Sequence, residues 1–379
     1  MDFKLTKEQE MIRKMVREFA LKEGEPIAAD LDETERFPHE TIEKMGKLNI
    51  LGLTIPKEYG GVYVDGISYA IVIEELSRVC ASTGVITAVH NSIAPFPIIK
   101  YGTQEQKDKY LPKLASGEMI GAFSLTEPNA GTDAGGLNTT ADLVGDEYIL
   151  NGTKIFVTNG PQAGVSTVLA KTDKDKGARG ISAFLVDAGT PGFTIGTLET
   201  KMGIRGSHQC EYVFEDCHIP KTNLIGKEGM GFKIAMAGLD HGRVGIAAQA
   251  LGIAQGAIDE SVKYAKEREQ FGRALGKFQA IQWMLADMET RTQAARFLVY
   301  SAAEKKTQGA RFSKDAAMAK LFASETANWV VNRAVQIHGG YGYTRDYPVE
   351  RYFRDAKITE IYEGTSEVQR MVISGSMMA

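Results

Sequence analysis

The sequence predicts an α+β protein in which a helical domain, a β domain and a second helical domain follow one another. The period of the apolar residues carries this prediction. It is helical up to about residue 120, becomes alternating between about 121 and 228, and is helical again from 229 to 379. A chain of 379 residues with 43% hydrophobic residues can bury a core in each of the domains 1–120, 121–228 and 229–379.

The first domain begins with a helix signal. Thr6 is followed three residues later by Gln9, which is the spacing of a capping box, and apolar residues then recur at helical intervals. Further runs of the same period cover about 38–50, 66–79 and 104–115. Proline and glycine separate these runs, so we expect an all-helical N-terminal domain.

The middle domain has the pattern of short strands. Asn151-Gly152 separates the apolar stretches 148–150 and 155–157, which predicts a β-hairpin with its turn at these two residues. Further strands are expected at 165–170, 181–186, 193–195 and 211–214. Many short strands without intervening helices favour a small barrel or sandwich.

The third domain is rich in alanine and has long amphipathic runs. These runs cover about 231–252, 254–268, 278–308 and 314–338. Long helices joined by short connections predict an antiparallel four-helix bundle.

Composition excludes several classes of protein. A net charge of −4 without a basic segment argues against nucleic-acid binding. The three cysteines and six histidines have no metal-ligand spacing, so no metal site is expected. The N-terminal segment lacks the pattern of a signal peptide, and no apolar run is long enough to span a membrane. We therefore expect a cytoplasmic protein.

The segment Phe123–Gly136, FSLTEPNAGTDAGG, lies where the helical and β patterns meet. Its small residues leave backbone N–H groups accessible to a phosphate, and the hydroxyls of Thr126 and Thr132 can donate hydrogen bonds. It lacks the GxGxxG pattern of a Rossmann site. Taken alone, it is explained more simply as a connecting loop.

A second candidate is Glu363, which lies between two helical patterns in the sequence YEGTSEVQR. Gly364 permits a tight turn, and Ser366 can cap the helix that follows. A carboxylate on such a turn, next to Tyr362, can occupy an apolar pocket, where a raised pKa suits it to remove a proton from carbon. Taken alone, a solvated surface glutamate is the commoner explanation.

Six motifs that occur in a fixed order favour a functional role for both candidates. They are TEPNAGTD, VTNG at 157–160, KMGIRGS at 201–207, RxQFG at 268–272, QIHGGYGY at 336–343 and YEGTSEVQR. With them the chain resembles the acyl-CoA dehydrogenase family along its whole length, and it is most similar to the bacterial short-chain, butyryl-CoA type. The resemblance implies a helical N-terminal domain, a middle β-barrel and a C-terminal four-helix bundle. It also implies FAD as cofactor, an electron-transfer flavoprotein as partner, and a homotetramer built as a dimer of dimers.

The resemblance also assigns roles to residues that match the family's motifs. The flavin and its pyrophosphate are assigned to Phe123, Leu125, Thr126, Gly131, Thr132, Phe156, Thr158, Thr365 and Glu367. The FAD of the neighbouring subunit is assigned to Arg268, Gln270, Phe271, Gln279, Gln336, Gly339 and Gly340. The substrate is assigned to Thr132, Asp240, Arg243, Tyr362 and Gly364. Phe156 departs from the family's pattern because many members carry tryptophan there, although an aromatic ring is retained.

In the mechanism that the resemblance implies, Glu363 removes the α-proton of an acyl-CoA thioester while the β-hydride is transferred to the flavin N5. The thioester oxygen is expected to accept hydrogen bonds from the N–H of Glu363 and from the FAD ribityl chain. Some relatives carry the base at the position of Gly242, which has no side chain here, so Glu363 is the only candidate. The reverse reaction reduces an enoyl-CoA.

The acyl group is predicted from the helical segment that matches the far end of the acyl pocket in the family. The segment Ser82–Ile98 lacks an insertion associated with medium-chain relatives, which favours a butyryl or crotonyl group. Ala94, Pro95 and Phe96 depart from the short-chain pattern, so an arylacryloyl-CoA reductase or a branched-chain dehydrogenase is the alternative. Oxidation of an acyl-CoA and reduction of an enoyl-CoA are both compatible with these motifs, as are a simple and a bifurcating flavoprotein partner.

More distant alternatives have their own discriminators. An acyl-CoA oxidase would usually be a much longer chain, and a nitroalkane oxidase would carry aspartate in place of Glu363. A non-catalytic helical scaffold would be colourless, whereas a flavoprotein is yellow.

Overall fold

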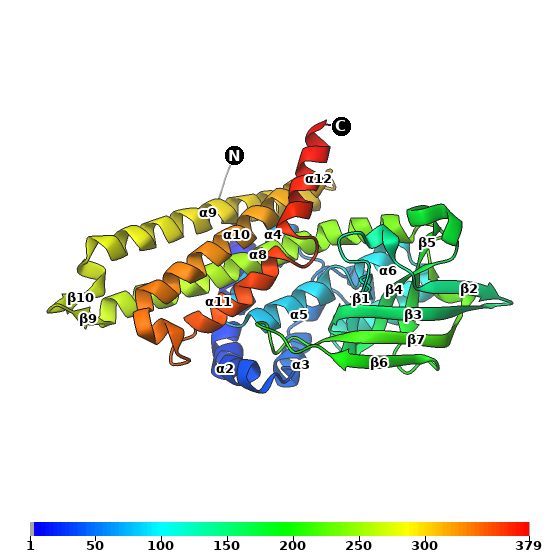
Figure 1. Cartoon of the computed structure of the whole chain (residues 1–379), viewed down its shortest axis with the longest axis horizontal. Coiled ribbons are helices and arrows are strands. Elements are labelled where there is room, and N and C mark those ends of the chain that lie inside the picture. Colours follow the sequence, from blue (N-terminus) through cyan, green and yellow to red (C-terminus); the bar gives the residue numbers. More distant parts are fainter. Residues whose placement is uncertain (1–3, 379) are drawn as a thin grey trace.

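The computed structural model describes residues 4–378. Residues 1–3 lie outside the described part. They belong to the N-terminal segment in which the sequence analysis finds no signal-peptide pattern. Helices form the first third of the chain, strands the middle and helices the remainder, and the β part lies at one end of an elongated molecule (Figure 1).

The N-terminal helices pack around α4, a helix that is buried along almost its whole length. It contacts α1 and α5 within its own domain and α8 and α9 of the C-terminal part. The capping box of Thr6 and Gln9 is present and begins α1. The helices of this part are α1 (Lys7–Phe19), α2 (Glu25–Thr34), α3 (His39–Lys47), α4 (Gly66–Ser77), α5 (Ala81–Asn91), α6 (Phe96–Tyr101) and α7 (Gln104–Ser116).

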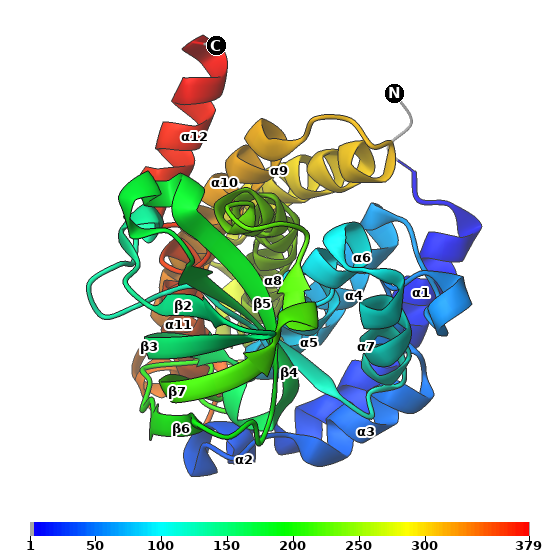
Figure 2. The ribbon, with the colours of Figure 1, turned by 90° about the vertical axis from the view of Figure 1, so that its right-hand side faces the viewer.

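The middle part is a single sheet of eight strands within the described residues. Its order is β6-β7-β3-β2-β4-β5-β8, with β1 paired in parallel to β4. Figure 2 shows the molecule from the end that carries this sheet, and the N-terminal helices lie beside it. The strands are β1 (Ile120–Ser124), β2 (Thr140–Val144), β3 (Glu147–Thr158), β4 (Ala163–Lys171), β5 (Ile181–Asp187), β6 (Phe193–Leu198), β7 (Gln209–Pro220) and β8 (Leu224–Ile225).

The predicted turn at Asn151-Gly152 is wrong, because β3 continues through these residues. The hairpin turn lies at Gly145-Asp146, between β2 and β3, where Gly145 has a φ of 62°. At Gly152 the pairing of β3 with β7 shifts register, and a Cβ there would lie 2.6 Å from the Thr139 hydroxyl. The glycine is therefore needed for a close approach inside the sheet, not for a turn.

Long helices dominate the C-terminal part. They are α8 (Gly231–Glu267), α9 (Gln279–Thr307) and α10 (Ser313–His338), and the short strands β9 (Glu269–Gln270) and β10 (Arg273–Ala274) join the first two. The shorter helices α11 (Val349–Lys357) and α12 (Ser366–Met378) pack against α10. In Figures 1 and 2, α12 extends beyond the body of the molecule.

The prediction of two helices between 231 and 268 is wrong, since α8 is one continuous helix of 37 residues. Gly252 and Gly256 in its middle are explained by packing. A Cβ at either position would lie 2.3 Å from a backbone oxygen, that of Glu74 or that of Arg78. The glycines therefore let α8 approach the end of α4 closely, and helical hydrogen bonding continues through them.

Buried charges fix the domains against each other. Glu74 on α4 pairs with Arg296 on α9 at 2.9 Å. Asp32 on α2 pairs with Arg354 on α11, and Asp355 accepts a hydrogen bond of 2.5 Å from the N–H of Ile204, in the KMGIRGS segment. These contacts position the sheet and the last helices around α8. None of the helices within residues 4–378 is long and apolar enough to cross a bilayer.

Candidate active site

Glu363 lies on a left-handed turn between α11 and α12. Its φ is 53° and that of Gly364 is 94°, so two consecutive residues adopt a conformation that is rare for L-amino acids. Thr365, and not Ser366 as the sequence suggests, accepts a hydrogen bond from the N–H of Val368 at 3.3 Å and so caps α12. The hydroxyl of Ser366 is buried and unpaired among residues 4–378.

The carboxylate of Glu363 rests on α8 at Gly242. A Cβ at Gly242 would lie 2.0 Å from the Glu363 Oε2 and 2.8 Å from the Cγ2 of Ile93. Within the described chain Oε2 is buried and has no hydrogen-bond partner. Only glycine at position 242 therefore leaves room for this carboxylate, which remains available for a ligand.

Side chains from α8 and α12 hold the backbone of the turn. The carbonyl of Glu363 accepts hydrogen bonds from Arg243 Nε at 3.4 Å and from Gln369 Nε2 at 3.3 Å. Arg243 is held in turn by Asp240, which accepts a bond of 2.7 Å from its guanidinium. Tyr362 donates a hydrogen bond to Gln249 on α8. The predicted substrate residues Asp240, Arg243, Tyr362 and Gly364 thus lie together around Glu363.

Burial raises the pKa of Glu363 to about 7, although the cations of Arg243 and Lys320 act in the opposite direction. A carboxylate with a pKa near neutrality is partly ionised in solution at pH 7 and basic enough to accept a proton from carbon. The position and the pKa of this group both suit a general base.

The predicted cofactor loop leaves β1 after Ser124. Phe123 is buried, Leu125 and Thr126 are half-buried, and Gly131 and Thr132 are exposed at the tip of the loop. The loop therefore offers its threonine hydroxyls and backbone to a ligand.

A buried ion pair shapes this loop. Glu127 accepts hydrogen bonds from the N–H groups of Asn138 and Thr139, at 2.5 and 2.9 Å, and pairs with Lys154 at 2.8 Å. Lys154 also donates to the carbonyl of Leu125 at 3.1 Å. The sequence analysis missed this pair because Lys154 falls in an alternating strand pattern, where a solvated lysine is the ordinary expectation.

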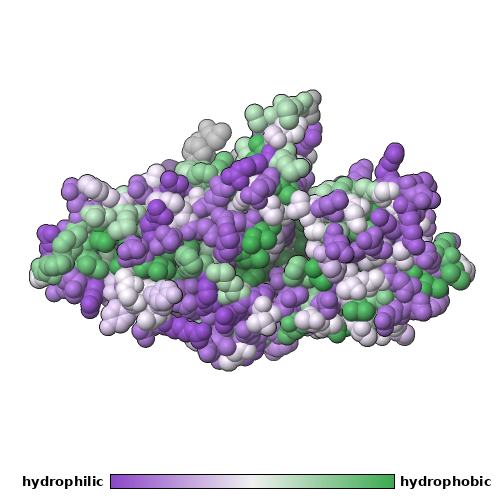
Figure 3. All heavy atoms as spheres, viewed as in Figure 1, coloured by the Kyte–Doolittle hydropathy of each residue, from purple (hydrophilic) through white to green (hydrophobic). Residues whose placement is uncertain are grey.

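Phe156 presents an aromatic ring to the surface of the sheet. Its φ is 56°, at an irregularity in the pairing of β3 with β7, and the residue is 55% exposed. Thr158, two residues further on, is half-buried, and its hydroxyl accepts a bond from Gln209 at 3.0 Å. An exposed ring beside a hydroxyl suits a planar heterocycle. In Figure 3 hydrophobic residues gather in a recess between the helical part and the β part.

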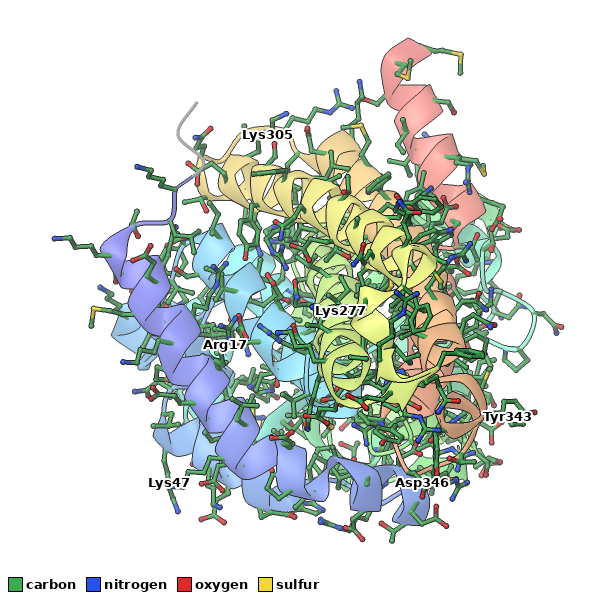
Figure 4. The ribbon with its side chains drawn as sticks, turned by 90° about the vertical axis from the view of Figure 1, so that its left-hand side faces the viewer. Arg17, Lys47, Lys277, Lys305, Tyr343 and Asp346 are labelled. Carbon is green, nitrogen blue, oxygen red and sulfur yellow. The ribbon has the colours of Figure 1, made fainter. Side chains whose placement is uncertain are left out.

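The second predicted cofactor region lies at the opposite end of α8. A pocket of about 490 Å³ there is lined by Tyr264, Arg268, Gln270, Leu275, Ile337, His338, Gly339, Gly340, Tyr341 and Thr344. A Cβ at Gly339 or Gly340 would meet no atom of residues 4–378 within 4 Å, so their backbone is open to a ligand. Figure 4 looks onto this end, where Tyr343 extends away from the body.

The remaining residues predicted for this region are at the surface. Phe271 is 94% exposed, and Gln279 and Gln336 are also exposed but do not line the pocket. Glu367 is exposed on the first turn of α12, and Thr365 is half-buried before it.

The described residues include no cluster of three or more His, Cys, Asp or Glu side chains that could hold a metal ion.

Family models match all three parts of the chain. The N-terminal domain of acyl-CoA dehydrogenase matches residues 6–118, the middle domain 122–217 and the C-terminal domain 229–378. A short-chain specific acyl-CoA dehydrogenase of Clostridium acetobutylicum is 58% identical, with 100% of both chains covered. An acryloyl-CoA reductase (NADH) of Anaerotignum propionicum is 53% identical and covers 100% of this chain and 96% of its own.

Solved structures of acyl-CoA dehydrogenases are also similar to this chain. Butyryl-CoA dehydrogenase from Megasphaera elsdenii has a TM-score of 0.98 at 48% identity, with 100% of both chains covered. A structure described as the electron transferring flavoprotein of Acidaminococcus fermentans, in work on flavin-based electron bifurcation, has a TM-score of 0.98 at 54% identity and the same coverage. A glutaryl-CoA dehydrogenase from Mycobacterium smegmatis in complex with FADH2 has a TM-score of 0.93 at 31% identity, covering 98% of this chain and 95% of its own. The chain belongs to the acyl-CoA dehydrogenase family.

Proposed function

We propose that this protein is an FAD-dependent dehydrogenase that oxidises the Cα–Cβ bond of a short-chain acyl-CoA, or reduces the corresponding enoyl-CoA, with Glu363 as the base. One observation carries the proposal. The Oε2 atom of Glu363 is buried against Gly242 and lacks a hydrogen-bond partner among the described residues, and the pKa of the carboxyl is raised to about 7. Such a group is costly to keep unless it acts on a ligand.

The residues of the chain fit the flavin that this chemistry needs. The exposed ring of Phe156 and the hydroxyl of Thr158 would hold the isoalloxazine, and the tip of the loop at Gly131 and Thr132 would hold the pyrophosphate. When bound, FAD accepts the hydride from the β-carbon.

The chain itself supplies the proton chemistry. Glu363 removes the α-proton, and its own N–H would donate to the thioester oxygen as negative charge develops there. Arg243, fixed by Asp240, holds the carbonyl of Glu363 and so orients both groups. A bound acyl chain would also exclude water from the carboxylate, which strengthens it as a base.

The FAD site would be shared between two subunits. Gly242, beside the base, and Arg268, at the second region, are 26 residues apart on or directly after α8, so they are separated by roughly 39 Å. One FAD molecule cannot reach both places, so the pocket at Arg268 would hold part of the partner's FAD. The exposed ring of Phe271 and the exposed methionines of α12 suit contacts between subunits in a tetramer.

The packing near the base favours a short acyl group. Ile93 lies against Gly242, and Ala94 is buried so closely against β1 that a Cβ at Gly121 would lie 2.9 Å from its own Cβ. The ring of Phe96 packs against that of His241, with centroids 4.2 Å apart and the two planes tilted by 33°. Ala94 therefore adds no free space, which supports a butyryl or crotonyl group over an arylacryloyl or branched one.

An electron-transfer flavoprotein is the proposed redox partner and the cytoplasm the proposed location. The partner follows from the similarity to chains studied in that context. Relatives are named both as dehydrogenases and as a reductase, so the proposed function includes both directions of the reaction.

Anaerobic flavin bleaching tests the proposal. Purified protein should be yellow, and butyryl-CoA should reduce its flavin faster than aryl-propionyl or branched acyl-CoAs. Changing Glu363→Gln should leave FAD bound but slow this reduction by roughly 10² to 10⁴-fold. Colourless protein, or a Glu363→Gln variant bleached at the wild-type rate, would refute the function. An aryl-propionyl-CoA tenfold better than butyryl-CoA would refute the short-chain assignment alone.

A further inference from the structure

Lys320 is a buried lysine on α10 whose side chain reaches the turn of the base. The residue is 0% exposed, and its Nζ donates a hydrogen bond of 2.7 Å to the carbonyl of Gly364. No carboxylate oxygen of the described residues lies within 4.0 Å of this ammonium group. Burial lowers the pKa of Lys320 to about 8. A buried cation without an ion-pair partner is unfavourable for folding, so its position calls for a functional reason.

Lys320 completes a set of donors around the left-handed turn. Gln369 Nε2 donates to the same Gly364 oxygen at 2.8 Å, while Arg243 and Gln369 hold the preceding carbonyl of Glu363. Buried carbonyls need such donors, and here the donors come from α8, α10 and α12. The three helices together therefore hold Glu363 and Gly364, the two residues whose φ values are positive.

The charge of Lys320 also acts on the carboxylate. The charged and titratable groups that face Glu363 are Arg243 from α8, Lys320 from α10, Tyr69 from α4 and the adjacent Tyr362. The negative charges of Glu363, Glu360 and Glu367 raise the pKa of Lys320, and the positive charge of Arg243 lowers it. Both cations stabilise the ionised form of Glu363, whereas burial favours the protonated form.

We propose that Lys320 is a positioning residue for the base: its ammonium group pins the Gly364 carbonyl, fixes the left-handed turn, and keeps the Glu363 carboxylate ionised above Gly242. The inference rests on the proposed role of Glu363 and extends it to a third helix. It assigns α10 a part in the reaction, although Lys320 does not contact the reacting atoms.

The test compares the pH dependence of anaerobic flavin reduction by butyryl-CoA in several variants. Lys320→Met removes the charge and the donor and should move the acidic midpoint of the rate upward by roughly one pH unit, which lowers the rate at pH 7 about fivefold. Lys320→Gln keeps a donor without the charge and should show the same shift, even if Lys320→Met folds poorly. Lys320→Arg keeps the charge and should retain the wild-type midpoint.

The matched control is Lys306→Met. Lys306 also has its pKa lowered to about 8 by burial, but its ammonium group lies 4.8 Å from the ring centroid of Tyr69 and not on the turn. This variant should keep the wild-type midpoint. A merely structural role of Lys320 would lower the rate equally at all pH values, and an unshifted midpoint in Lys320→Gln would overturn the inference. Failure of the proposed function is distinguishable, because Glu363→Gln would then be bleached at the wild-type rate.

Discussion

Gly242→Ala places a single methyl group where the Glu363 carboxylate now lies. The added Cβ would be 2.0 Å from Oε2, and non-bonded contacts shorter than 3.0 Å essentially do not occur, so the carboxylate must retreat by at least about 1 Å. A displacement of this size at a reacting group costs roughly 10²-fold in rate. Unfolding is not the expected effect, because alanine is favoured over glycine inside a helix by about 1 kcal/mol and the clashing atoms belong to the end of a side chain.

The measurement is the rate of anaerobic flavin reduction by butyryl-CoA, together with FAD content and the melting temperature. Gly238→Ala is the control on the same helix, since a Cβ there would meet Phe96 at an ordinary distance of 3.6 Å. We expect Gly242→Ala to keep its FAD and lose about two powers of ten in rate, while Gly238→Ala stays within a few-fold of wild type. A Gly242→Ala variant as fast as wild type would refute the placement of the base against α8.

Further predictions concern the cofactor and the pH dependence. Arg268→Ala removes a cation from the second pocket, so FAD loss and weaker subunit assembly should appear together in absorbance and sedimentation measurements; a stable monomer with full FAD would contradict the shared site. Lys154→Met leaves Glu127 buried without its cation, which should cost about 3–5 kcal/mol and release FAD; an unchanged melting temperature and flavin content would show that the pair does not hold the loop. Because only the ionised carboxylate of Glu363 accepts a proton, kcat/KM should rise with pH through about 7 and level off above it. A flat profile between pH 5.5 and 8 would exclude a base with this pKa.

The sequence predicts the succession of helical and β parts because the period of its apolar residues changes twice. It fails where a local signal has a tertiary cause. Asn151-Gly152 has the composition of a hairpin turn, yet Gly152 serves a close approach to Thr139 within the sheet. Similarly, Gly252 suggests a helix end, but it permits contact between α8 and α4.

In the candidate active site too, the sequence predicts local features but not those that depend on tertiary contacts. The motif containing Glu363 is local, so the sequence points to the turn, and the structure adds the reason that Gly242 must lack a side chain. Lys320 and Lys154 could not be identified, because a lysine in a helix or an alternating strand normally faces water. Their burial depends on partners 44 and 27 positions away in the chain. The φ of Phe156 likewise depends on the irregular pairing with β7.

The length of α8 has a consequence for mixtures of variants. On the proposed shared arrangement, the end of the helix beside the base and the end beside Arg268 serve different FAD molecules. A chain with Glu363→Gln and a chain with Arg268→Ala would then carry lesions in different halves of a centre. Co-expression of the two inactive chains would form hybrid oligomers in which some centres receive both intact halves. If activity is restored by such intersubunit complementation, each active centre contains residues of two chains. The effect of a mutation must then be measured on the dimer and not assigned to a single chain.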